Sequence, residues 1–317
     1  MTQWLNHNGP WREWHSATNS ARMHHAWIFA GKTGVGKRDF ALKAARELVA
    51  EAGVPQPAEH PDIFELTYGP KDKKAESARD SGKPFELARS LRVGQIREMQ
   101  RRLTTRPTLG ARRVIIVNPA DDLETASSNA LLKSLEEPPK GTFFVLITHR
   151  PSRLLPTIRS RCRILRFPDL DHAQLTQMLT ASGQVANPDV VRAAAGSYGA
   201  AARFIEEGLA PVARLMEELL KGDDANFAAR AELSRQIGPR ADRVRMQAVF
   251  ELAQRITSER ARQSQSPGGR MALVQAHTDL VALASQAPTH NFDPGLLSLE
   301  IGTLLVSVHT ASEPAHG

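Results

Sequence analysis

A glycine-rich stretch near the N-terminus carries the residue types that hold phosphate. Residues 31–38 read GKTGVGKR and match the pattern G-x-x-x-x-G-K, between a predicted strand and a predicted helix. We expect Gly31, Gly34 and Gly36 to let backbone N–H groups approach phosphate oxygens, and Lys37 to reach the outer phosphates. This order of strand, loop and helix predicts a P-loop nucleotide-binding fold.

The same stretch lacks the residues that bind magnesium and activate water. Position 38 is Arg, where a Ser or Thr hydroxyl would bind Mg²⁺. Asn118 and Pro119 follow the predicted strand at 112–117, where an acid for the metal and a glutamate for water are expected. The residues therefore predict no ATP hydrolysis by this chain. Two interpretations stay open: Lys37 holds a phosphate, ATP or ADP without turnover, or the loop only packs the first helix.

The elements that must position this loop alternate between strand and helix. Short apolar runs predict strands, and apolar residues at helical spacing predict the helices between them. Such alternation indicates a parallel sheet covered by helices on both faces. The predicted strands are 24–30, 60–67, 112–117, 142–148 and 163–167, and the helices between them are 38–52, 91–103, 125–136 and 156–160.

After residue 168 the pattern becomes entirely helical. We predict helices at 171–182, 188–207 with a break at 197–199, several within 209–263, and two more at 270–286 and 294–310, with a loop at 264–269. The predicted domains are an α/β domain at 1–167, a small helical domain at 168–208 and a helical C-terminal domain at 209–317.

Composition and hydropathy indicate the cellular compartment of the protein. The 317-residue chain has a formal net charge of +7 and one cysteine, Cys162, which excludes an internal disulfide framework and a zinc site with two or more thiolates. A single thiol fits a reducing cytosol. No apolar run approaches the ~20 residues that span a bilayer, and no apolar signal core opens the chain. We therefore expect a cytoplasmic protein that is neither exported nor embedded in a membrane.

Positive charge is concentrated in two stretches. Residues 71–113 hold 13 Lys or Arg and 5 Asp or Glu, and residues 149–166 hold six Arg and no acid. Such stretches attract phosphate, either of a nucleotide or of nucleic acid. Part of 71–90 is also typical of a solvated, unordered insertion, and we favour that interpretation for it. The tryptophans at 4, 11 and 14 could stack on bases, but we expect them to anchor the N-terminal segment to the body.

The most specific segment runs from Asn129 to Cys162 and reads NALLKSLEEPPKGTFFVLITHRPSRLLPTIRSRC. It closely resembles the clamp-loader branch of the AAA+ ATPases, which share N-A-L-L-K-x-L-E-E-P-P, a buried strand and S-R-C. The stretch RMHHAWIFAGKTGVGK resembles the same branch, and the resemblance covers about residues 22–207. It implies an AAA+, RecA-like P-loop domain, a helical lid at 168–208 and an oligomerisation collar at 209–317.

The resemblance also implies a role for one arginine. In that branch the arginine of S-R-C enters the ATP site of the neighbouring subunit as an arginine finger supplied in trans. Here that residue is Arg161, whose forked, permanent charge suits phosphate. Ser160 and Cys162 are expected to position the turn and fill the core. The degenerate nucleotide site narrows the resemblance to the subunit of the bacterial DNA polymerase III clamp loader that does not hydrolyse ATP.

Two departures from the branch affect these expectations. Many of its members carry a four-cysteine zinc module after the first helix, and this chain has no cysteine there, so no zinc is expected. A sensor arginine is usual in G-S-x-R, but residues 196–199 read GSYG. This missing arginine is a further argument against ATP hydrolysis.

The implied partners are the gamma/tau and delta subunits of the clamp loader, the sliding clamp and, through the assembly, primed DNA. The chain would not be an ATPase by itself but part of the DNA-directed DNA polymerase III holoenzyme. Two alternatives remain: an ATP-hydrolysing gamma/tau-like subunit with an unusual magnesium site, or a replication accessory protein that binds DNA directly through residues 71–113.

Overall fold

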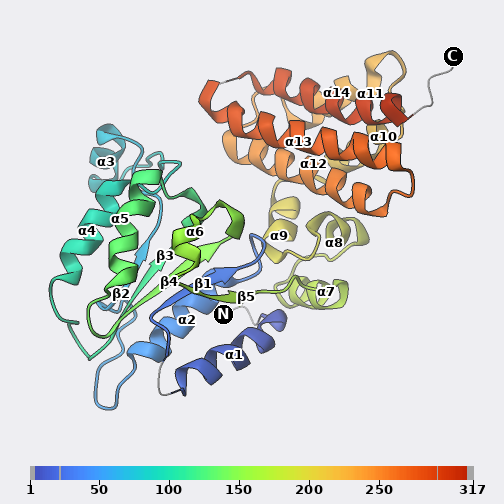
Figure 1. Cartoon of the computed structure of the whole chain (residues 1–317). Helices are drawn as coiled ribbons and strands as arrows, with labels where there is room; N and C mark the ends of the chain where they lie inside the picture. Colours follow the sequence, from blue (N-terminus) through green and yellow to red (C-terminus); the bar gives the residue numbers. More distant parts are fainter. Residues whose placement is uncertain (1–3, 21–22, 291, 313–317) are drawn as a thin grey trace. The chain divides into compact units, whose positions relative to one another are not determined.

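A computed structural model describes residues 4–20, 23–290 and 292–312 (Figure 1). The chain divides into two compact units, Met1–Leu170 and Asp171–Gly317. The first is an α/β unit and the second is helical, as the sequence predicts. The finer division into lid and collar at residue 208 stays a prediction.

A five-stranded parallel sheet forms the centre of the first unit. Its strand order is β2-β3-β4-β1-β5, so β1 lies between β4 and β5. Every residue of β1 and of β3 is buried, which is typical of a parallel sheet covered on both faces. All five predicted strands are confirmed: β1 (Ala26–Ala30), β2 (Ile63–Leu66), β3 (Arg113–Val117), β4 (Thr142–Thr148) and β5 (Arg163–Arg166).

Alternation along β1 explains the two helical layers. Trp27 and Phe29 belong to one core cluster, and Ala26, Ile28 and Ala30 belong to the other, because successive strand residues point to opposite faces. The first cluster contains side chains of α1 (Asn8–Thr18) and α2 (Lys37–Val49); the second contains side chains of α4 (Val93–Leu103), α5 (Thr125–Glu136) and α6 (Pro156–Arg159). Figure 1 shows these helices around the sheet.

The N-terminal segment is helical, which the sequence analysis does not predict. The short 3-10 helix η1 (Leu5–His7) leads directly into α1. Trp14 is fully buried against Trp27 and Phe29, and the Trp11 ring lies 4.0 Å from that of Phe40. The expected anchoring role of the N-terminal tryptophans is therefore confirmed.

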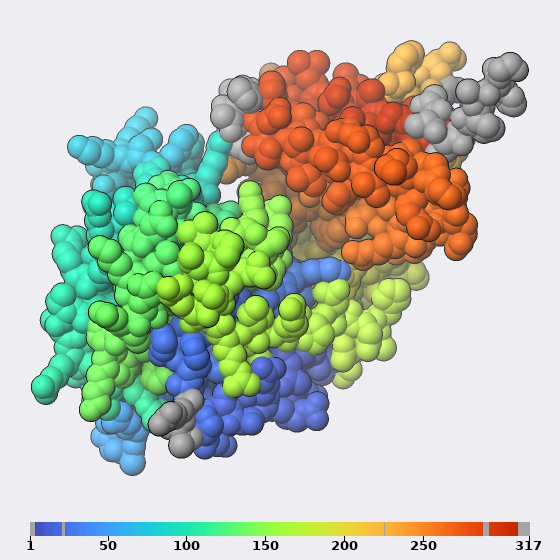
Figure 2. Space-filling model, in the orientation of Figure 1, coloured from blue at the N-terminus to red at the C-terminus, as the bar shows by residue number. Residues whose placement is uncertain are grey.

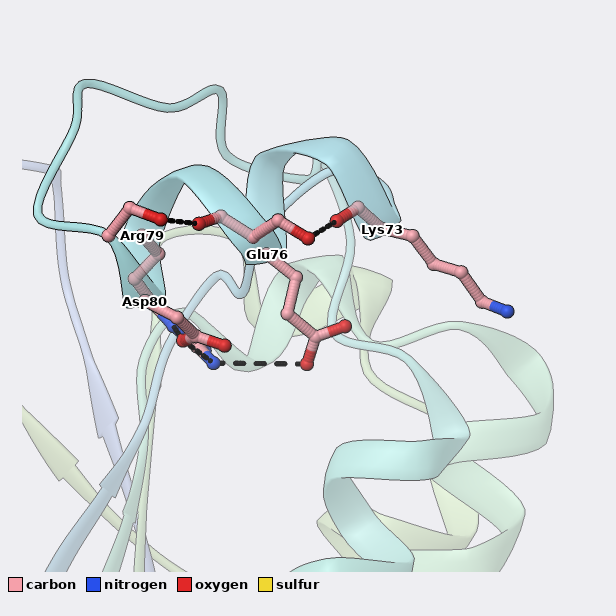
Figure 3. A network of polar contacts seen from close by, with 6 residues as sticks. Lys73, Glu76, Arg79 and Asp80 are labelled. Atoms are coloured by element: carbon pink, nitrogen blue, oxygen red, sulfur yellow. Dashed lines mark hydrogen bonds and ion pairs between the residues drawn. The ribbon is translucent and has the colours of Figure 1, made fainter.

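The expectation of an unordered segment within 71–90 is wrong. Residues Lys73–Asp80 form helix α3, whose N-cap Asp72 accepts a hydrogen bond from the Ala75 N–H at 2.8 Å. A bridge between Pro70 and Leu87 closes the base of the segment. The charges on α3 also pair with one another, since Arg79 faces Glu76 at 3.8 Å and Asp80 at 2.8 Å (Figure 3). The Asp72 cap and, more weakly, the Glu76–Arg79 pair three residues apart stabilise this helix, and composition alone reveals neither.

Helices alone make up the described part of the second unit. Figure 2 shows side chains of α13 (orange) and α14 (red) next to each other on its surface, and these two helices pack together. The bounds are α7 (His172–Ala181), α8 (Pro188–Ala194), α9 (Tyr198–Glu206), α10 (Ala210–Leu220), α11 (Ala228–Ile237), α12 (Arg243–Gln263), α13 (Pro267–His290) and α14 (Pro294–Ser312). The described residues also form the 3-10 helices η2 (Ala120–Asp122), η3 (Pro151–Arg153) and η4 (Ala225–Phe227).

One loop in this unit is shorter than predicted. Helix α13 already begins at Pro267, so only the first half of 264–269 is a loop. Proline favours the first turn of a helix, where its missing N–H costs nothing. None of the helices that the structure describes is both long and apolar enough to cross a bilayer.

Candidate phosphate-loop site

The loop between β1 and α2 has the backbone conformation of a phosphate-binding turn. Gly34 has a φ of 77° and Gly36 a φ of 84°, values that favour glycine. Gly31 lies against Phe167, the residue that follows β5, and an added Cβ would meet its carbonyl oxygen at 2.7 Å. Helix α2 begins at Lys37, so the N–H groups of its first turn open onto the loop. The structure thus brings all four residues predicted for phosphate binding together.

Lys37 is seated inside this loop. Its side chain is buried, and Nζ donates hydrogen bonds to the carbonyl oxygens of Gly31, at 2.7 Å, and Lys32. Burial lowers the pKa of Lys37 to about 8, against the opposing effects of Asp121 and Asp169. An ammonium group has three donors, so one N–H remains for an acceptor such as a phosphate oxygen.

The residues at the two positions that would bind magnesium, Arg38 and Asn118, both bond to Glu65 instead. Nε and Nη2 of Arg38 each lie 2.7 Å from a carboxylate oxygen of Glu65, and Asn118 Nδ2 donates to the same carboxylate at 3.0 Å. Burial alone would raise the pKa of Glu65, but the hydrogen bonds from Arg38 and Asn118 hold it below its usual value. Glu65 lies in β2, beside β3, and the sequence analysis misses it. A charged residue in an otherwise apolar strand is the signal that could have found it.

A second carboxylate near the loop is also committed to structural bonds. Asp121 accepts hydrogen bonds from the Thr148 hydroxyl, from the His149 N–H at 2.6 Å and from the Arg150 N–H at 3.1 Å. It therefore fixes the end of β4. Burial, followed by the charge of Lys37, lowers the pKa of His149 to about 4, so this imidazole is neutral at physiological pH.

The N-terminal segment lies against the loop. An added Cβ at Gly36 would lie 2.3 Å from Cδ2 of Trp4, so the indole occupies the space beside this glycine. Trp4 Nε1 donates to the Asp39 carboxylate at 2.9 Å, and His7 Nε2 lies 2.8 Å from the Val35 carbonyl oxygen. An aromatic ring and a carboxylate thus stand at the first turn of α2. The sequence predicts that Trp4 anchors the N-terminal segment to the body of the protein, but it does not predict this contact with the loop.

These contacts decide which parts of a magnesium nucleotide the residues fit. The glycine turn and Lys37 fit a phosphate group. Arg38 and Asn118 do not fit Mg²⁺, because a guanidinium and an amide N–H donate hydrogen bonds where the metal needs oxygen ligands. The Glu65 carboxylate has the right oxygens, but Arg38 and Asn118 engage it. Within the described parts of the chain, no group of three or more His, Cys, Asp or Glu could hold a metal ion.

Arg161 and the phosphate loop lie at opposite ends of the parallel strands. It comes two residues before β5, and Arg163 of β5 pairs with Trp27 at the start of β1. The phosphate loop instead follows Ala30, at the end of β1. Because β1 and β5 are parallel, Lys37 lies beyond the carboxyl ends of the strands and Arg161 lies before their amino ends. The side chain of Arg161 is 36% exposed and pairs with Glu136, with Nη2 and Oε1 2.7 Å apart.

Fold and site together define a P-loop α/β protein in which the residues at the metal-binding positions, Arg38 and Asn118, donate hydrogen bonds to Glu65. The sequence model of the family described as "DNA polymerase III, delta subunit" matches residues 6–171, just over half of the chain. This chain therefore belongs to that family.

Several named proteins are similar to this chain. The DNA polymerase III subunit delta' of Pseudomonas aeruginosa is 34% identical over 168 residues, covering 48% of this chain and 46% of the relative. The subunit gamma/tau of Mycobacterium tuberculosis is 34% identical over 192 residues, covering 57% of this chain and 32% of the relative. Among solved structures, a DNA polymerase III gamma subunit-related protein of Thermotoga maritima has a TM-score of 0.49 and 16% identity, covering 95% of this chain and 100% of that one. The chain spans about half the length of the curated delta' relatives it matches.

Proposed function

We propose that this chain is the delta-prime-like subunit of a bacterial DNA polymerase III clamp loader. In this role it does not hydrolyse ATP and supplies Arg161 to the ATP site of a neighbouring subunit. The assembly opens the sliding clamp and places it on primed DNA. Family membership and the curated delta' relatives support the subunit assignment.

One relationship supports a role in trans. Arg161 and Lys37 lie at opposite ends of the strands of the same parallel sheet, so Arg161 is not placed to act on a phosphate at Lys37 of its own chain. A partly exposed arginine at that end of the strands can act on the phosphate of another molecule. A guanidinium suits that task because its charge is permanent and its donors form a fork.

Gamma/tau and delta subunits are the proposed neighbours, with the sliding clamp and primed DNA reached through the assembly. We place the protein in the bacterial cytoplasm. Residues 168–208 are the proposed lid and 209–317 the proposed oligomerisation collar. Any phosphate, ATP or ADP at Lys37 is held without turnover, since Arg38 and Asn118 replace the usual metal ligands and both donate to Glu65.

The two alternatives fit the site less well. A gamma/tau-like ATPase needs magnesium ligands, and Arg38 and Asn118 both donate to Glu65. Direct DNA binding through 71–113 needs uncommitted positive charge, and several of the basic side chains face carboxylates. These are Lys71 with Glu86, Arg79 with Asp80, and Arg101 with Glu98.

The test is ATP turnover by the reconstituted clamp loader containing either the wild-type chain or Arg161→Ala. Sizing first establishes equal assembly. We expect turnover to fall at least tenfold with Arg161→Ala, which corresponds to about 1.4 kcal/mol of lost transition-state stabilisation. Arg159→Ala, which removes the same charge from the end of α6, is the matched control and keeps normal turnover. Equal turnover for Arg161→Ala and wild type would refute the finger role.

A further inference from the structure

Arg161 is held by two groups from different helices. Its Nη1 donates to the Thr157 carbonyl oxygen of α6 at 2.9 Å, and its Nη2 lies 2.7 Å from Oε1 of Glu136. A third, longer contact joins Nη1 to the Ser160 hydroxyl at 3.4 Å. The guanidinium is thus fixed on one side by backbone and on the other by a carboxylate.

Both anchors rest on the buried core. Glu136 is the last residue of α5 and follows Leu135, which is 1% exposed. In α6, Ile158 is fully buried in the same core cluster as Leu135. Neither helix can shift without disturbing this cluster, because close-packed interiors resist displacement. The position of the Glu136 carboxylate relative to Arg161 is therefore set by the fold.

The arginine keeps donors for a further acceptor. A guanidinium carries five N–H groups, and the contacts to Thr157, Ser160 and Glu136 engage at most three of them. Nε–H and one N–H of Nη2 remain. The contacts fix the direction of the side chain and leave part of the fork available.

We propose that Glu136 is the positioning residue for Arg161: its carboxylate holds the guanidinium in the orientation that reaches the neighbouring subunit's phosphate. This inference rests on the proposed arginine-finger function and goes beyond it by assigning a second residue. An unrestrained arginine loses rotamer freedom when it engages a ligand, and a carboxylate that orders it beforehand reduces that loss.

The size of the effect follows from exposure. Glu136 is 47% exposed and Arg161 36% exposed, so the pair is partly screened by water. Exposed ion pairs contribute only weakly, because water and salt screen them. We therefore expect Glu136→Ala to lower kcat for ATP in the reconstituted clamp loader by about two- to fivefold, with the KM for ATP and the assembly unchanged.

Three variants separate positioning from general damage to the fold. Glu136→Gln keeps a hydrogen-bond acceptor and is expected to restore part of the lost turnover. Glu137→Ala removes the adjacent carboxylate and is the matched control, with normal turnover. In an Arg161→Ala background, Glu136→Ala is expected to cause no further loss, because the two residues act through one guanidinium.

The outcomes also separate this inference from the proposed function. If Arg161→Ala lowers turnover and Glu136→Ala does not, the positioning role is refuted and the finger role stands. If Glu136→Ala raises turnover, Glu136 restrains Arg161 rather than positioning it, and the inference is again refuted. If Arg161→Ala has no effect, the proposed function itself fails. Additive losses in the double variant would show that Glu136 acts elsewhere.

Discussion

Arg38 and Glu65 form a two-bond ion pair in which Nε and Nη2 each lie 2.7 Å from a carboxylate oxygen. The pair joins the first turn of α2 to β2 at the position where a magnesium ion would need oxygen ligands. Hydrogen bonding to Glu65 raises the pKa of Arg38, so the pair stays ionised over the physiological range.

This pair predicts a stability change on removal of one partner. Arg38→Ala leaves a carboxylate that is only 17% exposed without its guanidinium, so we expect a loss of about 1–2 kcal/mol in the free energy of unfolding. Urea denaturation of the isolated chain measures it. Glu65→Gln combined with Arg38→Ala should lose less than the two single changes added together. Strictly additive losses would contradict the pairing.

The contact between Trp4 and the phosphate loop predicts that nucleotide affinity depends on Trp4. The indole lies beside Gly36 and bonds Asp39, where phosphate would meet the first turn of α2. In wild type, ADP would have to displace the indole and its hydrogen bond to Asp39. Trp4→Ala removes that cost, which is about that of one modest hydrogen bond with its packing, so the variant is expected to bind ADP about tenfold more tightly. Equilibrium dialysis with ADP in EDTA measures the change.

Two controls belong with that measurement. Adding Lys37→Ala to Trp4→Ala should abolish the gain, since Lys37 is the cation seated in the loop. Magnesium should leave the affinity unchanged, because Arg38 and Asn118 are bonded to Glu65. Equal ADP affinity with and without Trp4 would show that the indole does not restrict the loop.

His149 predicts a loss of stability in mild acid. Burial and the charge of Lys37 lower its pKa from 6.5 to about 4. Since the folded pKa is below the unfolded one, the unfolded chain binds more protons as the pH falls through this range, and stability decreases. The contribution is about 2 kcal/mol between pH 7 and pH 5. Denaturation curves at both pH values should show a smaller difference for His149→Gln. An unchanged difference would assign the loss to other groups.

Cys162 is predicted to be a poor nucleophile in the folded protein. Burial raises the pKa of its thiol to about 12, so very little thiolate exists at pH 8. Iodoacetamide should modify the native chain at least tenfold more slowly than the chain in urea, as followed by mass spectrometry. Rapid modification of the native protein would contradict the burial of this thiol.

The local signals that predict the fold are strong because they repeat. Five apolar strands alternate with helices, and all five strands form at or within a few residues of their predicted positions. Residues 73–80 are the instructive failure: their composition is polar, so hydrophobic periodicity could not reveal α3. The capping Asp72 and the Glu76–Arg79 pair, three residues apart, support that helix instead.

The amino-acid sequence by itself determines the phosphate loop and the absence of its metal ligands, because those residues are neighbours in the chain and their chemistry depends on residue type. Only the tertiary structure decides which distant residues contact Arg38, Gly36 and Arg161. Glu65 is 27 residues from Arg38, Trp4 is 32 residues from Gly36, and Glu136 is 25 residues from Arg161. The packing of the elements around the sheet brings each pair together, and no local pattern encodes contacts over such separations.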